Sequence, residues 1–121
     1  MAQWKVIQRD CYPGHKEKKL KKKQKQLIDN IFQNLETYII LIESNGNPDL
    51  IKRNNTFVHE EKNGLYAIDQ RPPAGGNQYR LYIYPDVENL TLYVLIIGDK
   101  KTQSSDIKEA HKDIGRIRNG K

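Results

Sequence analysis

The sequence predicts a small α+β domain, with N-terminal helices and a C-terminal helix packed on one twisted antiparallel sheet. Three observations predict it. A helical pattern free of glycine and proline covers residues 16–42, strand-like runs follow between residues 65 and 97, and a second helical pattern ends the chain. The 121 residues suffice for one modest hydrophobic core, so we expect a single domain over residues 1–121.

The first half predicts a strand and a long helix. "WKVIQRD" at 4–10 alternates loosely, and Pro13 and Gly14 end this short strand. Residues 16–42 would span about 40 Å as one helix, and a kink or a split near residues 25–29 stays open. "SNGNPD" at 44–49 ends the helix. Its apolar face repeats at spacings of three, four and seven, and comprises Leu20, Leu27, Ile31, Leu35, Tyr38 and Ile42.

The second half predicts a sheet. "NTFVHEE" at 55–61 is a weak strand candidate, and "KNG" at 62–64 is a turn signal. "LYAIDQR", "YRLYIY" and "LTLYVLII" are the stronger strands, separated by the loop "PPAGGN" and the turn "PDVEN". Their hairpin-like spacing favours antiparallel pairing. In "YRLYIY", alternation puts Tyr79, Leu81 and Ile83 on one face and Arg80, Tyr82 and Tyr84 on the other.

The last element is predicted to be a capped helix. Ser104 or Ser105 can serve as the N-cap, and Asp106 favours the positive end of the helix dipole. The expected buried stripe consists of Ile107, Ala110, Ile114 and Ile117.

The positive charge is concentrated in one segment. The formal net charge is +6, and "KEKKLKKKQK" at 16–25 alone has seven lysines and one glutamate, so the rest of the chain is neutral overall. Such a block attracts polyanions in a salt-dependent manner, although a solvated helix start is the simpler alternative. We name as candidate RNA-binding residues Lys16, Lys18, Lys19, Lys21, Lys22, Lys23 and Lys25.

Composition excludes several classes of protein. Cys11 is the one cysteine, so the chain can form neither an internal disulfide nor a cysteine zinc cluster. No apolar run approaches the ~20 residues that span a bilayer, and "MAQWKVIQRD" lacks the apolar core of a secretory signal. We therefore expect a soluble, cytoplasmic protein.

Three segments in order carry a resemblance to a known family. They are "GLYAIDQR" at 64–71, "GNQYRLYIY" at 76–84 and "LTLYVLIIGDKKTQSSDIKEA" at 90–110. They resemble the RelE/ParE toxin superfamily, particularly its HigB-like and phage-type members. The resemblance implies a microbial RNase-like fold with two N-terminal helices against a twisted sheet. Many such toxins cut messenger RNA in the ribosomal decoding site and are neutralised by an antitoxin, whereas ParE-type relatives poison DNA gyrase.

An RNase of this type would use the 2′-hydroxyl of RNA as the nucleophile, without metal or other cofactor. The protein must then neutralise charge on the phosphate and move protons. The resemblance makes Arg80 the first phosphate-binding candidate, joined by Lys100 and Lys101 at the strand exit. Where the family has its first arginine, this chain has Asp69, and Arg71 follows two residues later on the same face. Asp69 would be costly beside a phosphate unless Arg80 or Lys101 pairs with it.

Other side chains could complete the site. His111, next to the buried stripe of the last helix, is a candidate for proton transfer because an imidazole titrates near neutral pH. His59 and His15 are weaker candidates. Tyr82 and Tyr84 could stack on a base or simply cover the sheet. Each residue also has an ordinary alternative role as a surface or core side chain.

These observations leave three functions open. The first is the toxin of a type II toxin–antitoxin system, acting as a metal-independent mRNA endoribonuclease with mRNA, ribosomal RNA and an antitoxin as partners. The second is a non-catalytic binder, either a gyrase poison or a degenerate toxin, favoured by Asp69 and by the lack of a tyrosine after Tyr93. The third is a plain nucleic-acid-binding domain that uses residues 16–25.

Overall fold

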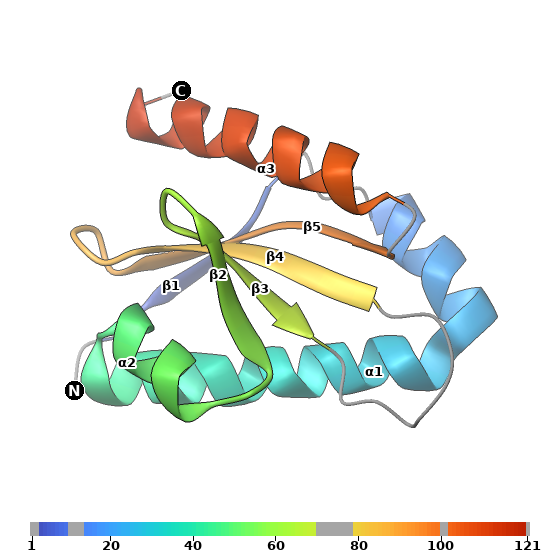
Figure 1. Cartoon of the computed structure of the whole chain (residues 1–121), viewed down its shortest axis with the longest axis horizontal. Helices are drawn as coiled ribbons and strands as arrows, with labels where there is room; N and C mark the ends of the chain where they lie inside the picture. Colours follow the sequence, from blue (N-terminus) through green and yellow to red (C-terminus); the bar gives the residue numbers. More distant parts are fainter. Residues whose placement is uncertain (1–2, 10–13, 70–78, 100–101, 121) are drawn as a thin grey trace.

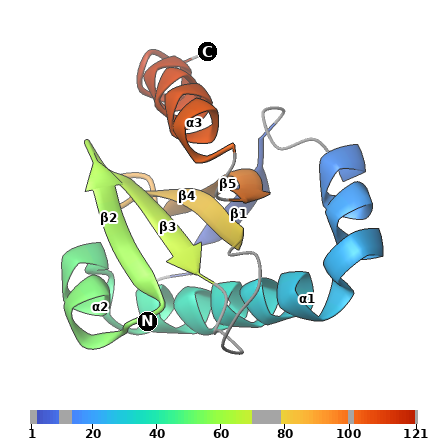
Figure 2. The same cartoon turned by 45° about the vertical axis from the view of Figure 1, so that its right-hand side comes forward.

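The computed structural model describes residues 3–9, 14–69, 79–99 and 102–120, with only the backbone of residues 14–28 and 99. Three layers make up the fold: one five-stranded sheet lies between helices α1 and α2 on one side and helix α3 on the other (Figures 1 and 2). The predicted small α+β architecture is confirmed at this level.

The sheet is mixed, so the prediction of a purely antiparallel sheet was wrong. Its strand order is β1-β5-β4-β3-β2, and β1 (Lys5–Gln8) pairs in parallel with β5 (Thr91–Asp99), with Val6 opposite Leu92. The remaining strands pair antiparallel, as expected from their hairpin-like spacing. The first strand was predicted, but its partner lies more than eighty positions away in sequence, beyond any local pattern.

Helix α1 (Gly14–Asn45) confirms the predicted long helix and extends beyond it at both ends. It is one continuous helix, and it bends between its blue first turns and the cyan part that crosses the sheet (Figures 1 and 2). Gly46, with φ +66°, follows its last residue. The predicted apolar face is buried against the sheet as far as side chains are described, through Ile31, Leu35, Tyr38 and Ile42.

A short helix, α2 (Pro48–Asn54), was not predicted. The segment "SNGNPD", interpreted as a helix end, also starts the next helix. The side chain of Asn47 accepts a hydrogen bond from the backbone N–H of Leu50 at 3.1 Å, and Pro48 occupies the first turn, where proline is favoured. Ile51 anchors α2 in the core with 1% of its surface exposed.

The predicted Asn-Gly turn joins β2 (Val58–Lys62) to β3 (Leu65–Asp69). Asn63 and Gly64 have φ values of 54° and 86°, as a two-residue hairpin turn requires. A bulge between Glu60 and Lys62 interrupts the pairing just before the turn. The weak strand prediction at 55–61 is thus confirmed in its second half.

Strand β4 (Tyr79–Asp86) is buried on both faces. Tyr79, Leu81 and Ile83 belong to the core under α1, whereas Tyr82 and Tyr84 belong to the core under α3. The predicted alternation is correct, and the second face is covered by α3.

Helix α3 (Gln103–Arg118) begins one residue before the predicted caps. Thr102 occupies the N-cap position, and its hydroxyl donates to the Asp106 carboxylate at 2.6 Å instead of capping the backbone. The predicted stripe is confirmed: Ala110 and Ile114 are buried, and Ile107 and Ile117 pack against the same core.

A buried ion pair links α3 to the end of β1. The guanidinium of Arg9 meets the buried carboxylate of Asp113 through two contacts, Nε–Oδ2 at 2.9 Å and Nη2–Oδ1 at 3.0 Å. Bidentate pairing of this kind fixes the relative position of two elements. Among the described residues, no helix is long and apolar enough to cross a lipid bilayer.

Candidate functional site

Arg80 lies on the α3 side of the sheet, near the start of β4. Its cross-strand partners are Asp69 on β3 and Gly98 on β5. The guanidinium contacts two carboxylates: Nε lies 3.2 Å from Oδ1 of Asp69, and Nη1 lies 3.5 Å from Oε1 of Glu61. The side chain of Arg80 is 27% exposed, so a ligand could reach it from the rim of the sheet.

His59 extends this group of charges onto the edge strand β2. It lies opposite Ala67, and its Nε2 is 2.5 Å from Oδ2 of Asp69. Four side chains from three adjacent strands therefore touch in the order His59, Asp69, Arg80, Glu61. We refer to these four residues as the β2–β4 cluster.

The backbone around the cluster is held by hydrogen bonds. The Asp69 N–H donates to the carbonyl of Phe57 at 2.8 Å, and the side-chain amide of Asn34 on α1 donates to the Asp69 carbonyl at 2.7 Å. The end of β3 is thus tied both to the segment before β2 and to α1. This support holds the backbone at Asp69 in place, so little conformational entropy is lost there when a ligand binds.

Burial dominates the electrostatics of Asp69. It raises the pKa of this carboxyl above its usual range, His59 and Arg80 act in the opposite direction, and Glu61 adds to the increase. Burial also raises the pKa of Tyr82, the next residue on the Arg80 face, to about 12. One guanidinium faces two carboxylates, so a phosphate at Arg80 must compete with Asp69 and Glu61.

Two atoms of the cluster are buried without a well-formed hydrogen bond. They are Nε2 of His59 and Oδ1 of Asp69, whose charged neighbours lie at ion-pair distance. Buried polar atoms are normally satisfied, and an unsatisfied one can mark a group that performs chemistry or binds a further group. Trp4 and Tyr38 each have one such atom in the core, but neither atom has a charged partner of this kind among the described residues. The cluster is therefore the strongest functional candidate in the described part of the chain.

Several predicted site residues cannot be compared with the structure. Arg71, Lys100 and Lys101 lie outside the described residues. The lysines of residues 16–25 lie on α1, where only the backbone is described. Gly98, opposite Arg80, is two positions before Lys100, so the chain leaves β5 at the corner where Arg80 lies.

Gly98 allows α3 to approach β5 closely. A Cβ atom at this position would lie 1.8 Å from Oδ2 of Asp106 and 2.6 Å from Oγ1 of Thr102. Glycine is therefore required here for packing, which gives a physical reason for the glycine in "GDKKTQ". The start of α3 is held beside the Arg80 corner by this contact.

The structure corrects the expected role of two tyrosines. Tyr82 is 1% exposed and Tyr84 is 9% exposed, both under α3. The ring of Tyr84 stacks on Tyr93 with centroids 5.9 Å apart, and the guanidinium of Arg118 lies 5.5 Å from its centroid. Neither ring is free to stack on an RNA base, because both support α3.

His111 is partly exposed on α3, as expected for a residue beside the buried stripe. Within the described residues, it forms no hydrogen bond or ion pair with the β2–β4 cluster. The structure therefore gives His111 no partner in this site, whereas His59 has one.

Sequence reasoning undervalued His59 and missed Glu61. The Asn-Gly turn at 63–64 predicts the hairpin, but its uninterrupted register would place His59 opposite Ile68, on the face turned to α1. The bulge shifts the pairing by one residue, so that His59 lies opposite Ala67 and on the same face as Arg80. The bulge before the turn, which a sequence pattern does not reveal, turns Glu61 toward Arg80.

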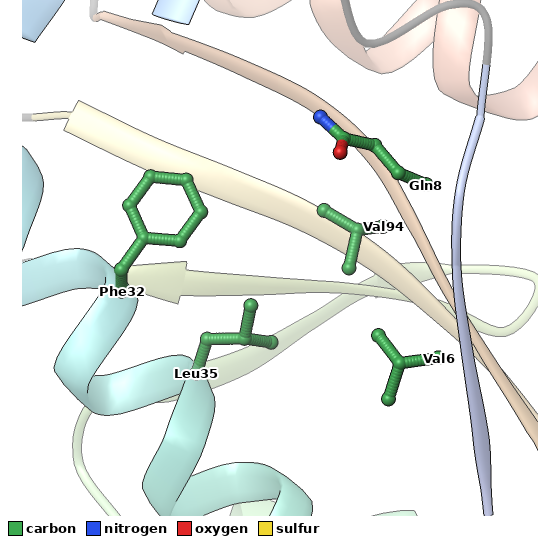
Figure 3. Close-up of a pocket in the computed structure, with 5 residues that line it drawn as sticks. All are labelled: Val6, Gln8, Phe32, Leu35 and Val94. Atoms are coloured by element: carbon green, nitrogen blue, oxygen red, sulfur yellow. The ribbon is translucent and has the colours of Figure 1, made fainter.

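Two further observations limit the choice of site. In the described part of the chain, no group of three or more His, Cys, Asp or Glu side chains is arranged to hold a metal ion. An apolar hollow of about 310 Å³ lies on the opposite, α1 side of the sheet (Figure 3). None of its lining residues in the described part of the chain is charged, so these residues do not suit phosphate chemistry; they are Val6, Gln8, Phe32, Leu35 and Val94.

Comparisons of the chain with known protein families, with characterised proteins and with solved structures found no match.

Proposed function

We propose that this protein is a metal-independent endoribonuclease, and that it acts as the toxin of a toxin–antitoxin pair on mRNA at the ribosome. The observation that carries the proposal is the β2–β4 cluster. It combines a guanidinium, an imidazole and two carboxylates at an accessible rim of the sheet. These are the groups that phosphodiester cleavage by a 2′-hydroxyl requires, namely a cation for the phosphate and groups that transfer protons.

Charge supports the same substrate. The whole formal excess of +6 lies in residues 16–25, on the first turns of α1. A polyanion such as mRNA or ribosomal RNA is the natural partner of such a segment. The ordered motifs at 64–110 carry the RelE/ParE resemblance. That resemblance supplies the expected antitoxin and a cytoplasmic site of action.

The test measures cleavage of a defined mRNA, alone and in a purified translation system, by the wild-type protein and by Arg80→Ala. Loss of the guanidinium should lower the cleavage rate by about 100-fold or more, because it removes the cation that stabilises the transition state. Arg80→Lys should restore only part of the rate, since an ammonium cannot bind two phosphate oxygens in the same plane.

Arg53→Ala is the matched control. Arg53 is an arginine on α2 that is 70% exposed and pairs with Asp49 within its own helix. Its loss should leave cleavage unchanged. Absence of cleavage by the wild-type protein in both settings would refute the proposal.

One observation favours a second candidate, a non-catalytic binder. Arg80 is paired with Asp69 and Glu61, so its charge is largely compensated before any phosphate arrives. In a gyrase poison or a degenerate toxin, Arg80 would stay paired with Asp69 and Glu61, because it would have no phosphate to stabilise during cleavage. Expression that breaks DNA while mRNA stays intact would identify the gyrase poison, and lack of toxicity would identify the degenerate form.

A further inference from the structure

The two histidines with described side chains, His59 and His111, differ in their contacts, and this difference indicates which of them can transfer a proton at the site. His59 lies on β2 and faces the same side of the sheet as Arg80, because its cross-strand partner Ala67 belongs to the core under α3. It is the only described histidine in ion-pair contact with a carboxylate, at 2.5 Å from Asp69. His111 has no such contact among the described residues.

His59 has the most exposed side chain of the four cluster residues. The side chain of His59 is 40% exposed, followed by Arg80 at 27%, Asp69 at 25% and Glu61 at 20%. Nε2 of His59 is buried against Asp69, so the exposed surface belongs to the rest of the side chain. The ring thus meets a carboxylate through Nε2, and Nδ1 is the nitrogen that would meet a substrate.

An imidazole held in this manner is suited to proton transfer. A carboxylate on one ring nitrogen fixes the orientation of the ring and stabilises its protonated form. Asp69 also contacts Arg80, its direct cross-strand partner. A phosphate bound by Arg80 would therefore lie near His59, because both side chains contact Asp69 on the same face of the sheet.

We infer that His59 is the proton-transfer residue of the site and that Asp69 is the residue that positions it, an inference that rests on the proposed endoribonuclease function. His59 takes the proton of the 2′-hydroxyl as the 2′-oxygen forms its bond to phosphorus. The bond between phosphorus and the 5′-oxygen breaks, and this oxygen takes a proton from water. The products are a 2′,3′-cyclic phosphate and a free 5′-hydroxyl, and His59 returns its proton to solvent.

Among the described residues, the charged groups in ion-pair contact at this site come from three strands. They are Asp69 on β3, Arg80 on β4 and Glu61 on β2 itself. Within the same part of the chain, α3 contributes no ion pair to them, but its Asp106 lies beside Gly98, the partner of Arg80 on β5. Glu61 is the rival base, but it is the least exposed of the four side chains, and its contact is with Arg80.

The experiment compares kcat/KM and its pH dependence for the wild-type protein, His59→Gln, Asp69→Asn and Glu60→Gln on one RNA substrate. His59→Gln should lower the rate by about 100-fold or more and abolish the acidic limb of the pH–rate profile. Asp69→Asn should lower the rate less than His59→Gln does, and should lower kcat more than it raises KM, because His59 remains as the base but loses the carboxylate that orients its ring. Product analysis should find the cyclic phosphate.

Glu60→Gln is the matched control. Glu60 neighbours His59 on β2, and its carboxylate pairs with Lys52 of α2, on the other side of the sheet. Its loss should leave both rate and profile unchanged. Circular dichroism on every variant establishes that the fold is retained.

The outcomes separate this inference from the proposed function. If the wild-type protein cleaves RNA and His59→Gln cleaves within about threefold of it, the inference fails and the endoribonuclease stands. A larger loss with an unaltered pH profile also overturns it, since a structural role would act equally at every pH. If the wild-type protein does not cleave RNA, the proposed function fails, and the inference with it.

Discussion

Replacing Gly98 with alanine tests whether the start of α3 is placed by close packing on β5. The new Cβ would lie 1.8 Å from Oδ2 of the buried Asp106 and 2.6 Å from Oγ1 of Thr102. An ordinary contact needs about 3.5 Å, so Asp106 must retreat by roughly 1.5 Å. Because Asp106 belongs to α3, the helix must shift or the side chain must leave its buried place.

The expected cost follows from two contributions. Overpacking of a filled site costs about 1–3 kcal/mol, and loss of the 2.6 Å hydrogen bond from Thr102 to Asp106 costs about 1 kcal/mol more. Gly98→Ala should therefore lower the free energy of unfolding by about 2–4 kcal/mol. Urea unfolding, followed by circular dichroism and by the fluorescence of the buried Trp4, measures this value.

Gly115→Ala is the matched control. Gly115 lies within α3, and a Cβ there would have no neighbour within 4 Å. It should raise stability by about 0.5–1 kcal/mol, because alanine favours the helix more than glycine does. In an Asp106→Ala background, Gly98→Ala should cost less, since the nearest atom is gone. A cost below about 0.5 kcal/mol for Gly98→Ala alone would refute the packing argument.

Three further predictions concern stability and titration. Asp113→Ala should lower the free energy of unfolding by about 2–4 kcal/mol, because it removes the buried carboxylate that pairs with the guanidinium of Arg9. Glu109→Ala, on the exposed surface of the same helix, should lower it by less than about 0.5 kcal/mol. Similar costs for the two variants in urea unfolding would contradict this prediction. Burial raises the pKa of Tyr82 to about 12 and raises that of Tyr38 too. Their contribution to stability is present below pH ~10 and is lost as pH rises through the folded-state pKa. Absorbance at 295 nm should therefore show some tyrosines that ionise only at higher pH, together with unfolding. Ionisation of all tyrosines near pH 10 in the folded protein would contradict this prediction. The pKa of Asp69 is also raised, so the contribution of this one group to stability falls as pH rises from about 4 through its folded-state pKa. Relative to the wild type, Asp69→Asn should therefore gain stability between pH 3 and pH 7 in urea unfolding, and a relative loss would contradict the burial argument.

Local chemistry made much of the fold predictable. The face of Ile31, Leu35, Tyr38 and Ile42 indicated α1, because a period near 3.6 residues is a property of a single helix. The Asn-Gly turn indicated the β2–β3 hairpin, since only residues that tolerate positive φ fit there. In each case the determining contacts lie within a few positions along the chain.

The candidate site was predicted only in part. Arg80 was identified from a motif and from strand alternation, and the structure places it at an accessible rim of the sheet. Its partners were not foreseen as a group, because His59, Asp69 and Glu61 meet only after three strands pair. The bulge between Glu60 and Lys62 decides that Glu61 reaches Arg80.

The sequence alone determined α1, α3, the hairpins, the strand alternation and the position of the positive charge, since each depends on neighbouring residues. Tertiary structure decided the parallel pairing of β1 with β5, the covering of Tyr82 and Tyr84 by α3 and the assembly of the β2–β4 cluster. The reason is physical: burial and charge pairing act across space, where residues distant in sequence compete for the same neighbours.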